Sequence, residues 1–172
     1  MSTTTTPSAE LDAFDPARKL LSQDEAVARY RDRAGTVFTN GVFDVLHRGH
    51  LACLAAARAL GERLVVGVNS DASARRLGKG PDRPLNREQD RAFLLAGLAC
   101  VDAVVLFDED TPLAVLAKLR PAVYVKGGDY DMARLAETPL VQSWGGRSIA
   151  LPFVDGYSTT ALVQRIRAQQ QA

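Results

Sequence analysis

The sequence predicts an α/β protein: a single doubly wound, Rossmann-like, five-stranded parallel sheet with helices on both faces. Five short runs rich in apolar and β-branched residues alternate along the chain with segments of helical character. The runs are apolar almost throughout, as expected for parallel strands that are buried on both faces. Right-handed crossovers through the helices would then connect neighbouring strands.

The composition fits one ordinary globular domain. The 172 residues are 47% hydrophobic, and Lys+Arg at 21 against Asp+Glu at 20 give a net charge of +1. This balance offers no basic surface for nucleic acid. Cys53 and Cys100 lie far apart in sequence and form no CxxC pair, which argues against a disulfide framework. Without a secretion signal or an apolar run of membrane-spanning length, we expect a cytoplasmic protein with neither nucleic-acid nor membrane partners.

Three parts are expected along the chain. The Thr-rich opening indicates a flexible N-terminal tail over residues 1–21. Ser22 and Glu25 have the spacing of a capping box, so an N-terminal helix is expected within residues 22–35. The α/β domain would occupy residues 36–172.

The strands of this domain are expected at 36–41, 63–69, 103–107, 122–126 and 147–153. Helical segments separate them: one follows Gly49, and a second begins near Asn86, which stands three residues before Gln89 in a capping pattern. A last helix is expected over residues 161–169. In such sheets, ligands bind beyond the carboxyl ends of the strands.

The strongest functional signal lies in residues 39–50, between the first strand and the first crossover helix. His47 and His50 are the only histidines of the chain, and Gly49 lets the chain turn into a helix whose first amides can meet an anion. Three residues apart, both imidazoles can face one phosphate and donate hydrogen bonds to it. The alternative is a structural role or a metal site, for which Asp44 is a candidate third ligand.

The order Gly41-Val42-Phe43-Asp44 followed by His47-Arg48-Gly49-His50 resembles the signature of the cytidylyltransferase-like family of nucleotidyltransferases. FTNGVFDVLHRGH, VGVNSDAS, KGGDY and DGYSTT are, in that order, similar to adenylyltransferases that join ATP to D-glycero-β-D-manno-heptose 1-phosphate and release pyrophosphate. The resemblance covers roughly residues 36–168, which makes 36–172 the expected nucleotidyltransferase domain. It implies ATP and a sugar 1-phosphate as substrates, Mg²⁺ carried by ATP rather than held by protein ligands alone, and a homodimer.

The resemblance also implies roles for individual residues. Expected catalytic groups are His47, His50 and Lys79, the last in a Gly- and Pro-rich segment that looks like a mobile lid. Expected nucleotide-binding residues are Thr39, Asn40, Gly41, Phe43, Gly49, Lys126, Gly127, Gly128, Asp129, Tyr157, Ser158, Thr159 and Thr160. Expected residues for the second substrate are Asp44, Asn69, Asp71 and Arg91.

Simpler interpretations stay open for each motif and for the function. Residues 155–160 have the composition of an ordinary helix cap, 126–130 that of a turn, and 69–71 that of a capped loop. The chain could also be a cytidylyltransferase for glycerol 3-phosphate or a similar small phosphate ester. A non-catalytic nucleotide-binding module is a third possibility.

Overall fold

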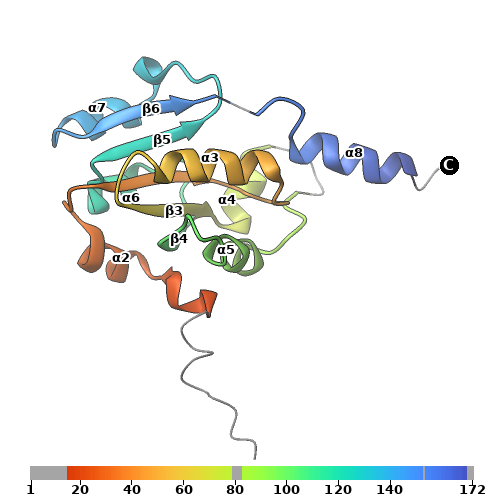
Figure 1. Ribbon diagram of the computed structural model, residues 1–172, viewed down its shortest axis with the longest axis horizontal. Coiled ribbons are helices and arrows are strands. Elements are labelled where there is room, and N and C mark those ends of the chain that lie inside the picture. Colours follow the sequence, from red (N-terminus) through yellow and green to blue (C-terminus); the bar gives the residue numbers. More distant parts are fainter. Residues whose placement is uncertain (1–14, 79–82, 153, 170–172) are drawn as a thin grey trace, which may run out of the picture.

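Six parallel strands form one sheet in the computed structural model, which describes residues 15–78, 83–152 and 154–169. Their spatial order is β1-β4-β3-β2-β5-β6, and every neighbouring pair is parallel (Figure 1). The strands are β1 Leu20–Leu21, β2 Thr36–Gly41, β3 Arg63–Asn69, β4 Ala103–Phe107, β5 Val123–Gly127 and β6 Arg147–Leu151. The doubly wound α/β class expected from the sequence is confirmed.

The sixth strand, β1, corrects the expected number of five. Leu20 and Leu21 pair with Val104 and Val105 of β4, and the 3-10 helix η1 (Pro16–Lys19) precedes them. These residues were expected to belong to a tail over 1–21; residues 1–14 of it lie outside the described part of the chain. A strand of two residues gives no periodic signal in a sequence, which is why it was missed. The other five strands lie within two residues of their expected bounds.

Helices cover both faces of the sheet. Figure 1 shows α3 (Arg48–Arg58) and α5 (Glu88–Ala96) lying against the sheet. Their buried residues share one core cluster with Val37, Val66 and Val125, so these helices cover the same face. The other face carries α2, α6 and α7, whose buried residues pack against Phe38, Val65 and Tyr124. These helices are α2 Gln23–Tyr30, α6 Leu113–Leu119 and α7 Glu137–Gln142; α4 (Asp71–Arg76) follows β3, η2 (Met132–Arg134) follows β5, and α8 (Thr159–Gln169) comes last.

Local capping decides where the first helices begin and end. The capping box expected at Ser22 and Glu25 is present, with each side chain bonded to the backbone of the other residue. The helix ends at Tyr30, earlier than expected, because the chain turns through positive φ angles at Asp32 (52°) and Gly35 (75°). The cap expected at Asn86 was wrong: α5 begins one residue after Arg87, which makes no side-chain capping bond.

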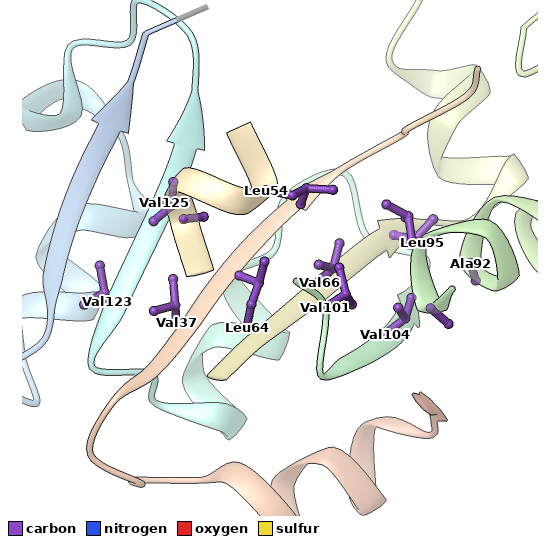
Figure 2. Packing of buried hydrophobic residues seen from close by; sticks show 13 residues of the cluster. Val37, Leu54, Leu64, Val66, Ala92, Leu95, Val101, Val104, Val123 and Val125 are labelled. Atoms are coloured by element: carbon purple, nitrogen blue, oxygen red, sulfur yellow. The ribbon is translucent and has the colours of Figure 1, made fainter. Parts of the chain in front are cut away.

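Leu54 is the largest buried side chain with which α3 packs on the sheet. Its side chain is 1% exposed and points into the cluster with Val37, Leu64 and Val125, whereas Leu51, one turn earlier, is 47% exposed (Figure 2). The two leucines therefore lie on the same helix, but only Leu54 contributes to the core.

We predict that Leu54→Ala lowers the free energy of unfolding by about 2–5 kcal/mol, because it removes apolar burial and leaves a cavity. Leu51→Ala is the matched control and is expected to change it by less than about 0.5 kcal/mol. Urea denaturation of both variants measures the difference. Equal losses would contradict the assignment of Leu54 to the core.

Candidate active site

The strand order reverses between β2 and β5, so their carboxyl ends form the switch point of the sheet. The chain leaves β2 for β3 on one side of the sheet, while β5 leads to β6 on the other. The segments that follow the two strands diverge there, which is the usual ligand position in doubly wound sheets. The predicted motifs at 39–50 and 126–130 both lie at this switch point.

His47 and His50 form a stacked pair at the start of α3. His47 is the N-cap residue, and its Nδ1 accepts a hydrogen bond from the backbone N–H of His50 at 3.3 Å. The ring centroids are 3.8 Å apart, and Phe43 meets the ring of His50 edge-on at 5.3 Å. The structure thus brings both predicted histidines to the helix end at which an anion is favoured.

Burial and the capping hydrogen bond together determine the protonation state and the tautomer of His47. Burial lowers the pKa of His47 from its ordinary value, which favours the neutral imidazole. Because Nδ1 accepts a hydrogen bond from the backbone N–H of His50, the single ring proton of the neutral form belongs on Nε2. His47 therefore offers an N–H donor on the side of the ring that faces away from the helix backbone.

A buried arginine holds the segment between β2 and α3. Arg91 is 0% exposed, and its guanidinium donates to the backbone oxygens of Val42 (2.5 Å), Asn69 (2.8 Å) and Asn86 (3.0 Å). Its Nη2 also forms an ion pair with Asp71 Oδ1 at 2.8 Å. One side chain thus joins the ends of β2 and β3 to the segment that enters α5.

Asp44 links the segment after β2 to the segment that precedes α5. Its carboxylate is 4% exposed; Oδ1 accepts from the backbone N–H groups of Leu85 (2.7 Å) and Asn86 (3.0 Å), and Oδ2 lies 2.7 Å from Arg83 Nε. The Asn86 side chain, which does not cap α5, donates to the Asp44 carbonyl oxygen at 2.6 Å instead. Between these contacts Phe43 has a φ of 49°, a conformation that bulky residues adopt only when their surroundings enforce it.

These contacts engage the residues that were predicted to bind the second substrate. Arg91 was expected to bind a substrate phosphate, but it has no exposed surface and already serves three carbonyls and a carboxylate. Asn69 is 2% exposed and donates to Ser73 Oγ at 2.9 Å, and Asp71 is paired with Arg91. The set Asp44, Asn69, Asp71 and Arg91 is therefore an internal network that shapes the site, which we call the Arg91 network.

The segment before α8 lies against the start of α3. A Cβ at position 49 would lie 3.0 Å from the Tyr157 Cβ, so a larger residue here would press against Tyr157. Arg48 lies beside the Tyr157 ring and donates to its hydroxyl at 3.4 Å. The Thr159 hydroxyl donates to the Val45 carbonyl oxygen, also at 3.4 Å. The predicted pairing of the two motifs at one edge of the sheet is therefore present.

Ser158 shows that the simpler interpretation of this segment also holds. Its hydroxyl accepts from the backbone N–H of Ala161 at 3.1 Å, an ordinary cap of α8. Thr160 lies in the first turn of that helix and is exposed. Capping and anion binding are compatible, since the amides of the first turn stay available to a ligand.

The end of β5 supplies a second group of polar side chains. Asn40 Oδ1 accepts from Tyr124 OH at 3.0 Å and from Lys126 Nζ at 3.2 Å. A Cβ on Gly127 would lie 2.7 Å from Cys53 Sγ, so glycine here lets α3 approach β5. Tyr124 was not predicted, because nothing distinguishes it in sequence from the apolar strand around it.

The remaining predicted residues take several positions. Thr39 is 3% exposed and donates to the Val125 carbonyl oxygen at 2.9 Å, so it joins two strands and offers no surface to a ligand. Gly41 ends β2, Gly128 lies in the turn after β5, and Asp129 is exposed beside it. Lys79 falls in 79–82, outside the described residues.

Across 15–78, 83–152 and 154–169, no group of three or more His, Cys, Asp or Glu side chains could hold a metal ion. Within the same ranges, no helix combines the length and the apolar character needed to cross a bilayer.

Two helix starts that lie together at the switch point of a doubly wound sheet are typical of nucleotide-binding α/β proteins. Comparison with known families narrows this class. The cytidylyltransferase-like family matches residues 38–165, and the chain belongs to it. The resemblance found in the sequence is thereby confirmed.

Individual relatives agree with this family. The chain is 60% identical over 152 residues to the D-beta-D-heptose 1-phosphate adenylyltransferase of Bordetella bronchiseptica, covering 87% of this chain and 94% of that protein. It is 51% identical over 149 residues to the Bifunctional protein HldE of Trichlorobacter lovleyi, of which it spans 30%. A solved lipopolysaccharide core biosynthesis protein from Thermoplasma volcanium superimposes with a TM-score of 0.60 at 28% identity, over 73% of this chain and all of that one.

We predict that Arg91→Met lowers the free energy of unfolding by about 3–5 kcal/mol, because it leaves buried carbonyls and the Asp71 carboxylate without their partner. Arg75→Met, on the exposed side of α4, is the matched control and should cost less than about 0.5 kcal/mol. Denaturant unfolding of both variants gives the comparison. A loss for Arg91→Met no larger than that of the control would show that the network does not hold the fold.

Proposed function

We propose that this chain is an adenylyltransferase that condenses ATP with D-glycero-β-D-manno-heptose 1-phosphate to give ADP-heptose and pyrophosphate. The observation that carries the proposal is the 60% identity to the Bordetella enzyme over nearly the full length of both chains. The nucleotidyltransferase site described above lies within the aligned family region.

In the proposed mechanism, a phosphate oxygen of the sugar 1-phosphate attacks the α-phosphorus of ATP. The bond from the α-phosphorus to the bridging oxygen breaks as the new P–O bond forms, and pyrophosphate leaves with the electron pair. No covalent enzyme intermediate is needed, so positioning and charge stabilisation supply the catalysis. His47 and His50 would stabilise the α-phosphate, with the Nε2–H of His47 aimed at charge that develops on its oxygens.

The leaving group would be held by the start of α8. The amides of its first turn and the hydroxyls of Ser158, Thr159 and Thr160 suit the β- and γ-phosphates. Thr159 and Tyr157 also contact the α3 side of the site, which supports a single polyphosphate bridging the two helix starts. Lys79 is proposed to offset charge on the same phosphates.

We propose that Mg²⁺ enters as the chelate of ATP. The carboxylate nearest the histidines, Asp44, is buried and committed to Arg83 and two backbone amides, so it does not fit a metal ligand. Phosphate oxygens and water are ligands that Mg²⁺ commonly keeps. The use of ATP supports a cytoplasmic reaction, and the homodimer stays a prediction.

The proposed function predicts pyrophosphate release only from ATP together with the heptose 1-phosphate. The assay crosses ATP, CTP, GTP and UTP, each with magnesium, against heptose 1-phosphate, glycerol 3-phosphate and phosphoethanolamine. Release with CTP and another acceptor would replace the substrates while keeping the chemistry. Nucleotide binding without release from any pair would indicate a non-catalytic module.

His47 variants separate its structural role from its chemical one. We predict that His47→Ala loses both the cap and the imidazole, which lowers the free energy of unfolding by about 1 kcal/mol. His47→Asn is the matched variant: asparagine caps well, so stability should be kept while turnover still falls on the order of 100- to 1,000-fold. Turnover in His47→Asn close to that of the original chain would rule out a catalytic imidazole at this position.

A further inference from the structure

The Arg91 network leaves the proposed reaction without a site for its second substrate. The residues predicted to bind the sugar phosphate bind one another and are largely buried. A phosphate monoester needs hydrogen-bond donors and positive charge on an accessible surface. Such a surface has to offer donors that the nucleotide side of the proposed site does not use.

Such donors lie on the α7 face of the sheet. Side chains alternate between faces along a strand, and Phe38 and Tyr124 belong to the core cluster under α2, α6 and α7. Asn40 and Lys126, two residues further along β2 and β5, therefore lie on that same face at the carboxyl edge. The histidines lie on the opposite, α3 side.

The hydrogen bonds of Asn40 fix the direction of its amide. The Lys126 ammonium can only donate, so the Asn40 atom that it contacts has to be the oxygen, and the Tyr124 hydroxyl contacts this same atom. The Nδ2 branch, with its two N–H groups, then points the other way. Among the described residues Nδ2 has no hydrogen-bond acceptor, and Asn40 is only partly buried. It therefore presents donors to a ligand.

The Tyr124 hydroxyl beside Asn40 is buried and stays protonated at every working pH. The tyrosine ring is 0% exposed, and its position is fixed by pairing with Phe38 in the sheet. Burial, reinforced by the charge of the nearby Glu137 carboxylate and by a hydrogen bond to it, raises the pKa of Tyr124 well above its ordinary value, so its hydroxyl stays protonated.

Lys126 supplies the charge. Its ammonium lies 3.2 Å from Asn40 Oδ1 and 5.6 Å from the centre of the Tyr130 ring, which is 46% exposed. A cation held beside a donor amide at an accessible edge suits the dianion of a phosphate monoester.

The stereochemistry of the reaction favours the same face. In an in-line displacement, the attacking and the leaving oxygen lie on opposite sides of the phosphorus. If pyrophosphate departs toward the starts of α3 and α8, the attacking phosphate has to arrive from the other side. Asn40 and Lys126 lie on the face of the sheet opposite α3.

We propose that Asn40 and Lys126 bind the phosphate of the sugar 1-phosphate, and that Tyr124 is a positioning residue that orients the Asn40 amide. This assignment rests on the proposed function, and it moves Asn40 and Lys126 from the nucleotide to the second substrate.

Steady-state kinetics with each substrate varied separately tests the assignment. Asn40→Ala and Lys126→Met should each raise KM for heptose 1-phosphate about ten-fold or more, while KM for ATP stays within about two-fold. Tyr124→Phe should raise the same KM by a few fold, with a melting temperature close to that of the control Tyr30→Phe, another buried tyrosine. A rise in KM for ATP instead, or no change in either KM, would overturn the proposal.

Binding without turnover keeps this test separate from that of the proposed function. Calorimetric titration of heptose 1-phosphate into the original chain and into Asn40→Ala and Lys126→Met requires no reaction. Weaker binding of the sugar phosphate in both variants, with unchanged ATP binding, would support the subsite even if no pyrophosphate were released. Unchanged sugar-phosphate binding would overturn the subsite even in an active enzyme.

Discussion

The Arg91 guanidinium lies fully inside the protein, and a charge in that position is tolerated only if its donors are satisfied. The acceptors that satisfy it come from the ends of β2 and β3 and from the entrance to α5. The charge therefore draws three separate segments to one point. The loop from Val42 to His47 has little freedom once its first carbonyl and Asp44 are both held, which explains how Phe43 keeps a positive φ. The position of the histidine pair depends on this internal ion network.

The site that results is preorganised for charge stabilisation. His47 is kept neutral by burial and oriented by the amide that it caps, so no solvent has to reorganise when negative charge develops beside it. The start of α8 adds a second set of amides that lies against the first. The protein needs no covalent nucleophile and no metal-binding carboxylate cluster for this kind of transfer. In the proposed reaction, it needs to hold the phosphate of the sugar in line with the α-phosphorus and the leaving pyrophosphate of ATP.

The sequence predicted those features that a short segment contains in full. Five strands and the capping box at Ser22 were readable because their signals are local, and the histidine pair was readable because strand, turn and helix start are contiguous. The burial of a side chain, in contrast, depends on segments that are distant in the sequence. Arg91 and Asp44 look in sequence like surface charges available to a ligand, and only the folded chain shows that they neutralise partners from other segments. For the same reason the sequence did not reveal Tyr124, whose hydroxyl contacts Asn40 although the two residues are 84 positions apart in the chain. Nor did it reveal β1, whose two residues form a strand only because they pair with β4.

Helix α8 extends away from the rest of the molecule, and none of its described residues is buried (Figure 1). Its first turn nevertheless belongs to the site, where it is held by contacts of Tyr157 and Thr159 with the α3 region. Elements with so little burial open locally at low free-energy cost. A nucleotide bridging the two helix starts would bind only the closed arrangement and would stabilise it by mass action. The C-terminal helix is therefore the part of the chain whose protection from hydrogen exchange should depend most directly on the concentration of nucleotide.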